Sequence, residues 1–64
     1  MKQAMFTFDA VTMCYWPANK NAIAACAILS KMRLGEHDMV TVKDKGFEPI
    51  LQNGEPILRV NILV

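Results

Sequence analysis

The sequence has few of the residues that small proteins use for covalent or metal cross-links. Two cysteines and one histidine among 64 residues are too few for a disulfide framework or a zinc site. Cys14 and Cys26 also lack the CxxC spacing of a redox or metal motif. We therefore expect reduced thiols, no metal, and a location in the cytoplasm, where thiols stay reduced.

Net charge and long apolar runs are equally scarce. The formal charge is +1, and the seven cations are scattered among six acids, whereas nucleic-acid-binding domains usually carry a strong basic bias. Asp9, Lys20 and Lys31 interrupt the apolar stretches well before the roughly 18 residues of a membrane span, and Asp9 also interrupts a signal-peptide core. We expect no nucleic-acid partner, no membrane partner and no signal peptide.

Catalytic motifs are missing as well. The glycines, Gly35, Gly46 and Gly54, all lie at expected turns, so no glycine-rich phosphate loop is present. The run "GEHD" at 35–38 groups two acids with the histidine, and we interpret it as a solvated loop. No Ser-His-Asp pattern is evident. We predict a protein that is not an enzyme, with no catalytic residue and no cofactor.

What the sequence does contain is apolar residues, 53% of a short chain. A chain of this size has room for a single domain, 1–64, which buries only about 60% of the surface exposed on unfolding. Small domains usually need a cross-link, a metal or a partner subunit for stability. Self-association is the simplest way to cover the excess apolar surface, so we expect a homodimer or a larger homo-oligomer.

The order of apolar and turn-forming residues predicts a strand–helix–strand–strand chain of the α+β class. The helix begins at the N-cap candidate Asn19 and stops before Gly35. A right-handed crossover makes the first two strands parallel, and we expect a three-stranded sheet in order 1-3-2, packed on one helix. The predicted ranges are strand 4–14, helix 19–34, strand 38–44 and hairpin 47–52/55–64.

The segment "GFEPILQNGEPILRV" at 46–60 repeats Glu-Pro-Ile-Leu around Asn53-Gly54, the strongest short-range hairpin signal. A two-residue turn places Ile50 opposite Ile57 and Glu48 opposite Arg59. This pairing leaves Ile50, Ile57 and Arg59 on the face away from the core, where they are candidate binding residues.

Apolar residues also surround most of the predicted helix. One face carries Ala22, Ala25, Ile28, Leu29 and Met32, and another carries Ile23, Cys26, Ala27 and Leu34. A surface helix normally keeps about half its circumference polar, and one sheet covers only one side. The other side is expected to meet another subunit, unless the small alanines simply tolerate exposure.

The run "CYWP" at 14–17 places a thiol and two aromatic rings at the turn between the first strand and the helix. Tyr15 and Trp16 are candidates for anchoring a protein partner or stacking on a planar small ligand. Cys14 is a candidate thiolate if it lies at the helix N-terminus. The alternative is that the two rings cover the core and Cys14 is inert.

Two families are similar in part. The element order, and Gly54 followed by Leu58 to Val64, resemble the dodecins, small flavin-storing dodecamers, but Arg59 stands where dodecins carry a flavin-contacting glutamine. Asp9-Ala10, Cys14 to Pro17 and Gly35-Glu36 resemble the Asp-Ala, Cys-Pro-x-Pro and Gly-Glu motifs of the small sulfur-relay carriers of tRNA thiolation. On that resemblance Cys14 would carry the persulfide, although Tyr15 replaces the first proline.

The favoured function is therefore a small, non-enzymatic, self-associating interaction protein that binds through apolar and aromatic surface. The alternatives are a thiol or sulfur carrier acting through Cys14, and a small phage or mobile-element inhibitor of a host protein.

Overall fold

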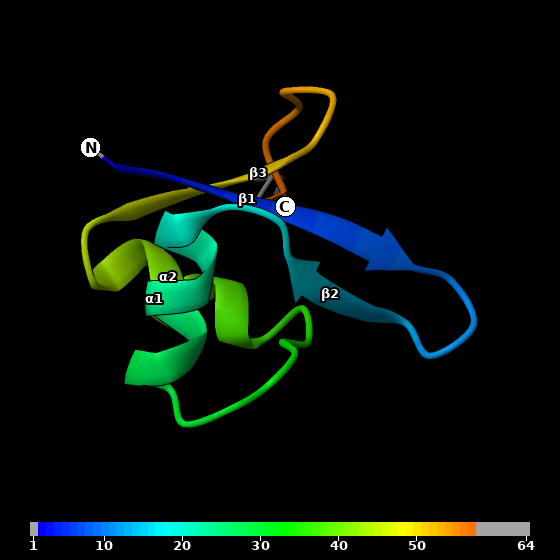
Figure 1. The fold of residues 1–64 in the computed structure, drawn as a ribbon, viewed down its shortest axis with the longest axis horizontal. Helices are drawn as coiled ribbons and strands as arrows, with labels where there is room; N and C mark the ends of the chain where they lie inside the picture. The colour runs from blue at the N-terminus through cyan, green and yellow to red at the C-terminus, as the bar shows by residue number, and fades with distance from the viewer. Residues whose placement is uncertain (1, 58–64) are drawn as a thin grey trace, which may run out of the picture.

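The computed structural model describes residues 2–57, which form a three-stranded sheet and two helices (Figure 1). The sheet order is β2-β1-β3, with β1 antiparallel to β2 and parallel to β3. The predicted small α+β domain with a three-stranded sheet is confirmed. The predicted strand order 1-3-2 is consistent with the observed sheet, because each contains two parallel strands and one antiparallel strand. The elements are β1 (Lys2–Asp9), β2 (Cys14–Pro17), α1 (Lys20–Ile28), α2 (Asp38–Asp44) and β3 (Phe47–Leu51).

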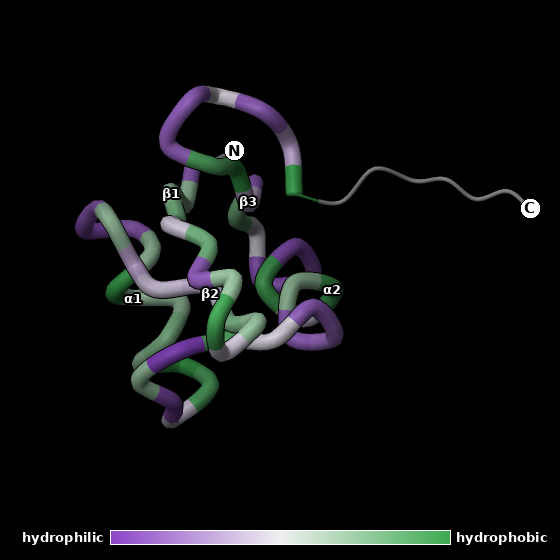
Figure 2. The backbone as a smooth tube through the Cα atoms, turned by 90° about the vertical axis from the view of Figure 1, so that its right-hand side faces the viewer, coloured by the Kyte–Doolittle hydropathy of each residue, from purple (hydrophilic) through white to green (hydrophobic). Residues whose placement is uncertain are grey.

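The two helices, rather than the single one predicted, supply the core on one face of the sheet. Side chains alternate along a strand, so Ala4 and Phe6 of β1 share a face, and both are fully buried. Helix α1 packs mainly on β1 and α2 mainly on β3, and in Figure 2 the helices lie apart below these two strands, with β2 between them. The core residues are Ala4, Phe6, Ala22, Ala25, Cys26, Leu34, Met39, Val42 and Phe47.

The single strand predicted over 4–14 is wrong, because the chain turns back at Ala10 and forms two strands. The Asp9 carboxylate accepts the Val11 N–H at 2.9 Å, and Met13 takes a left-handed conformation with φ of 58°. Val11 and Met13 continue the apolar pattern of a strand, but both side chains are exposed at the tip of the hairpin. The turn that joins β1 to β2 therefore contains apolar residues, which is why the sequence pattern resembles one continuous strand.

The predicted N-cap, Asn19, is confirmed and does more than cap α1. Its Oδ1 atom accepts the Ala22 N–H at 2.8 Å and also the Met5 N–H of β1 at 3.1 Å. Its Nδ2 atom donates to the Gln3 carbonyl at 3.0 Å. The carboxamide thus pairs with β1 as a backbone amide would, beyond the point where β2 ends at Pro17.

The predicted helix 19–34 is too long, since α1 ends at Ile28. Ser30 adopts the left-handed conformation, with φ of 56°, and the Lys31 N–H donates to the Cys26 carbonyl at 3.0 Å. These are the features of a Schellman motif, in which glycine usually holds the left-handed position. Because serine rather than glycine holds that position, the sequence does not indicate that the helix ends there.

The strand predicted over 38–44 is also wrong, because these residues form α2. Asp38 accepts the Gly35 N–H at 2.9 Å and so stabilises the first turn of the helix. Met39 and Val42, three residues apart, are buried in the core, which is helical spacing. The β-branched residues favour a strand by propensity, and core packing overrides that preference.

The first residues of the predicted second hairpin strand, 55–57, do pair with β3, but in another register. β3 lies within the predicted range, and Ile50 pairs with Pro56 in an antiparallel bridge rather than with Ile57. The Leu51 N–H donates to the Glu55 carbonyl at 2.8 Å, so the turn is wider than a two-residue turn. The predicted pairing of Ile50 with Ile57 is therefore wrong by one residue.

Candidate functional site

The β1–β2 hairpin extends past the end of β3, as the right-hand side of Figure 1 shows. The β1–β3 pairing stops at Phe6 and Leu51, whereas the β1–β2 pairing continues to Asp9 and Cys14. This end of the hairpin, residues 7–14, is called the projecting hairpin below.

The projecting hairpin carries exposed apolar side chains. Val11 is 92% exposed and Met13 66%, and Phe8 is 38% exposed. Beside them lies an open groove of about 280 Å³, lined by Phe6, Thr7, Phe8, Leu51, Gln52 and Asn53. This surface is not predicted from the sequence, because Val11 and Met13 lie within the single strand predicted over 4–14.

Tyr15 and Trp16 do not form one aromatic surface, because neighbouring residues of a strand point to opposite faces. Tyr15 packs against the core, and its ring centroid lies 4.9 Å from that of Phe8. Its N–H and C=O are bonded to Leu34, and burial, with the nearby Glu36 carboxylate, raises the pKa of its hydroxyl. The alternative interpretation, in which Tyr15 covers the core, fits this geometry.

Trp16 lies on the other face of the sheet, opposite Thr7 of β1, and is half-buried. The Arg33 guanidinium lies 5.6 Å from the centroid of the indole ring, within the range of a cation–π contact. A planar ligand that stacks on this side of the ring would have to displace Arg33.

Cys14 is not at a helix N-terminus, so the reason for expecting a thiolate at this position no longer applies. It is the first residue of β2, opposite Asp9, and α1 begins six residues later at Lys20. The thiol lies 3.4 Å from the Thr12 carbonyl. The pKa of Asp9 is lowered, chiefly by the Val11 N–H, so the partner of Cys14 is a carboxylate at neutral pH.

The remaining candidate binding residues do not gather into an exposed patch. Ile50 is only 5% exposed, and Ile57 is partly buried against the core. The prediction that these two form a surface left over from the hairpin is therefore wrong. Arg59, with the rest of residues 58–64, lies outside the described residues.

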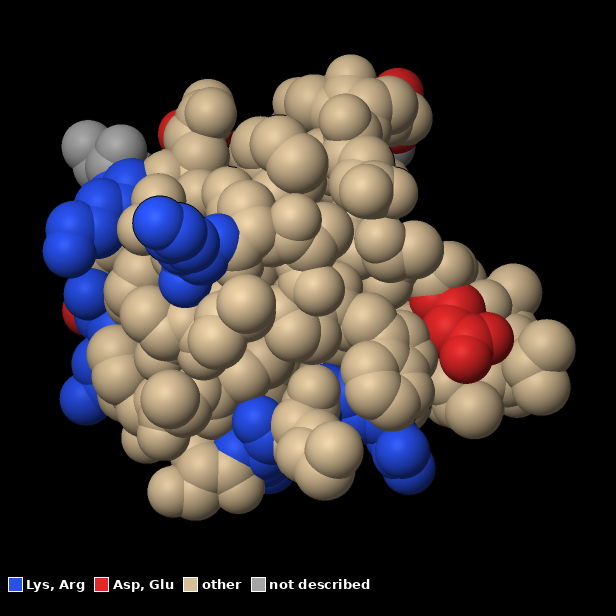
Figure 3. Space-filling view, in the orientation of Figure 1, with Lys and Arg blue, Asp and Glu red and all other residues tan. Residues whose placement is uncertain are grey.

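A second group of exposed apolar side chains lies on α1 and the segment after it, but neither predicted helix face is exposed as a whole, since Ala22 of one and Cys26 of the other are buried. Ile23, Ile28 and Met32 are 58%, 52% and 81% exposed. In Figure 3, uncharged residues cover most of the visible face, cations lie along its left and lower borders, and an acidic group lies at the right, near the end of the hairpin.

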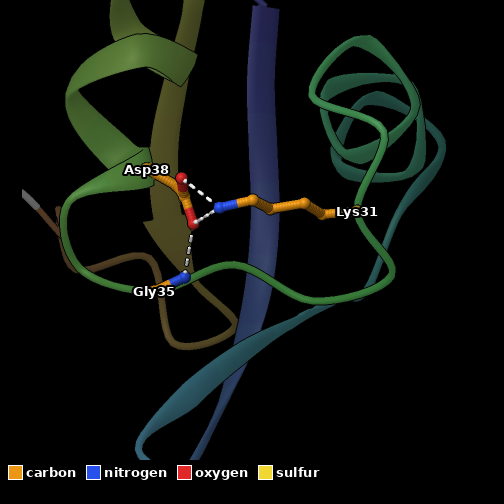
Figure 4. A network of polar contacts seen from close by, with 3 residues as sticks. All are labelled: Lys31, Gly35 and Asp38. Carbon is orange, nitrogen blue, oxygen red and sulfur yellow. Dashed lines mark hydrogen bonds and ion pairs between the residues drawn. The ribbon is translucent and has the colours of Figure 1, made fainter.

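The hydrogen-bond network around Asp38 was not predicted from the sequence. Asp38 accepts two bonds from Lys31, at 2.9 and 3.1 Å, and one from the Gly35 N–H (Figure 4). The Gly35 N–H lowers the pKa of Asp38 most, and Lys31 lowers it further. This network joins the end of α1 to the start of α2, which indicates a structural role, and the "GEHD" run is a helix start rather than a loop before a strand.

Comparison of the chain with protein-family models, curated proteins and solved structures found no match. Within residues 2–57, no three His, Cys, Asp or Glu side chains come together as metal ligands do. No helix in this range is long and apolar enough to cross a membrane. The candidate site is therefore defined by the geometry of the projecting hairpin and of α1.

Proposed function

We propose that the protein is a small, non-enzymatic, self-associating interaction protein that works through apolar and aromatic surface. The observation that carries this proposal is the exposure of large apolar side chains in two groups. One group, Phe8, Val11 and Met13, lies on the projecting hairpin, and the other, Ile23, Ile28 and Met32, lies on and after α1. Contiguous exposed apolar patches on soluble proteins commonly mark interaction sites.

Burial of this surface provides the driving force for association. Each Å² of apolar surface removed from water contributes about 25 cal/mol, and a 64-residue chain gains little from its own core. A protein surface, from a second copy or another partner, is favoured over a planar ligand because Arg33 already lies over the Trp16 ring. We place the protein in the cytoplasm, since Cys14 and Cys26 are both free thiols.

Sedimentation equilibrium of the purified protein tests self-association. The expected result is a mass above the 7.2 kDa of one chain that rises with concentration. A mass of one chain throughout the micromolar range would refute the self-association part of the proposal.

A further inference from the structure

Among residues 2–57, one edge of β1 has no strand partner beyond the end of β3. The Met5 N–H donates to Asn19 and the Met5 carbonyl accepts the Ala18 N–H, so the Met5 backbone groups face the β2 side. Backbone groups of successive residues point to alternate edges of a strand. The N–H and C=O of Phe8 therefore face the β3 side, and within residues 2–57 the β1–β3 pairing has already ended at Phe6.

The outer edges of β2 and β3 are partly covered in the described part of the chain. Leu34 pairs with Tyr15 on the outer edge of β2, and Pro56 pairs with Ile50 on the outer edge of β3. An unpaired strand edge is a ready template for another strand. The Phe8 edge is thus a place in residues 2–57 where the sheet can be extended, and it is the one that adjoins the groove.

The groove described above adjoins this edge, since Phe6, Thr7 and Phe8 form one of its walls. The opposite wall, Leu51 to Asn53, is the chain that leaves the sheet after β3. An extended strand laid along Phe8 would enter the groove, and its side chains would meet the lining residues.

We propose that two copies of this chain associate through the Phe8 edge, as antiparallel strands related by a twofold axis. The proposal rests on the proposed self-association and identifies the surface that mediates it. Phe8 of each copy exchanges two backbone hydrogen bonds with Phe8 of the other, so the two β1–β2 hairpins become one continuous sheet. Thr7 then lies beside Asp9 of the second copy, and like charges do not face each other.

A twofold pairing also gives the exposed tip a place to bind. An isologous interface uses the same surface on both copies. The two Phe8 edges therefore meet each other, and the groove of each copy meets the hairpin tip of the other. The turn after Asp9 directs Val11 and Met13 of one copy over the Leu51–Asn53 wall of the second. The groove and the most exposed side chains of the hairpin are then buried together.

The α1 surface is a poorer fit to a second copy because of its charge. Residues 20–34 include Lys20, Lys31 and Arg33 and no acid. Lys20 begins α1 and Lys31 follows its end, with the exposed Ile23 and Ile28 between them in the sequence. Lys31 is already paired with Asp38, so the repulsion between two such segments would come from Lys20 and Arg33.

Two matched variants of the full chain separate these surfaces. Val11→Asp places a charge on a side chain that is 92% exposed, and Ile28→Asp does the same on α1 at a side chain 52% exposed. Sedimentation velocity should show a dimer dissociation constant at least tenfold higher for Val11→Asp and within about twofold of wild type for Ile28→Asp. Circular dichroism reports whether both variants remain folded.

A backbone change tests the strand pairing itself. The chain can be assembled by chemical ligation at Cys14, with the amide nitrogen of Phe8 methylated in the first peptide. Methylation removes the donor and keeps the side chain, and it should raise the dimer dissociation constant at least tenfold, while the unmodified synthetic chain matches wild type.

The outcomes distinguish the two proposals. A wild-type chain that remains monomeric refutes self-association and this inference with it. A wild-type dimer that Ile28→Asp dissociates, while Val11→Asp and Phe8 methylation leave it intact, overturns the inference and moves the interface to α1.

Discussion

Replacing Asn19 with alanine should be the most damaging single polar substitution in the described part of the chain. The side chain makes three hydrogen bonds: to the Ala22 N–H, the Met5 N–H and the Gln3 carbonyl. Loss of an N-cap costs about 1 kcal/mol, and each of the other bonds contributes about 0.5–1.5 kcal/mol. Because the bond to Gln3 is exposed, we take its contribution at the lower end, and the expected loss is about 2–3 kcal/mol.

That loss is large for so small a domain. Stabilities of about 0.05–0.15 kcal/mol per residue imply that Asn19→Ala removes roughly a fifth or more of the free energy of unfolding. Urea unfolding followed by circular dichroism measures it. Asn19→Ser retains the cap but not the bonds to β1 and should lose less than Asn19→Ala, and Asn19→Asp, which keeps both acceptor bonds, should lose least. A loss below about 0.5 kcal/mol for Asn19→Ala, or wild-type stability for Asn19→Ser, would refute the proposed double role of the carboxamide.

Local geometry at Ser30, Asp38 and the two cysteines also determines measurable stability and reactivity. Ser30→Gly should raise the free energy of unfolding by about 0.5–1 kcal/mol, because Ser30 holds a left-handed conformation, and Ser30→Val should lower it; equal urea midpoints would contradict this. Because the pKa of Asp38 is lowered, its bonds stabilise the fold above the ordinary value of 3.8 and are lost as the pH falls below that value. Asp38→Asn should therefore flatten the decline in the free energy of unfolding measured from pH 5 to pH 2. An unchanged pH profile would contradict this expectation. Iodoacetamide should label Cys14 in the native protein before Cys26, which is 4% exposed and whose thiol pKa is raised by burial, and mass mapping that shows Cys26 modified first would be inconsistent with the core.

The parts of the fold that the sequence predicts are those set by local chemistry. Asn19 caps a helix wherever its carboxamide reaches the first-turn N–H groups, and β3 lies between Gly46 and the Asn53-Gly54 turn as the residue types indicate. The excess of apolar residues around α1 is evident in the sequence, but the exposure of Ile23 and Ile28 in particular is not, because the sequence does not show which side of the helix packs on the sheet.

The errors arise where local signals are ambiguous. The run at 38–44 has strand propensity and also the i, i+3 spacing of Met39 and Val42, and the contact of Asp38 with Gly35 and Lys31 favours the helix. Gly35 followed three residues later by Asp38 was a usable signal of a helix start.

Two other errors come from turns that lack glycine at the required position. Met13 and Ser30 both take left-handed conformations without glycine, so neither the β1–β2 turn nor the end of α1 was visible in the residue types. The missed β1–β2 turn hid the projecting hairpin, and with it the exposed Val11. The assignment of Tyr15 and Trp16 to opposite faces likewise depends on their lying in a strand, which the turn determines.

The central claim is that the chain associates with itself through apolar surface. Sedimentation equilibrium of the wild-type protein, from low to high micromolar concentration at neutral pH, tests it most directly. The account predicts a transition from the 7.2 kDa of one chain towards twice that mass, shifted to higher concentration by Val11→Asp. A single species of 7.2 kDa over the whole range would contradict it.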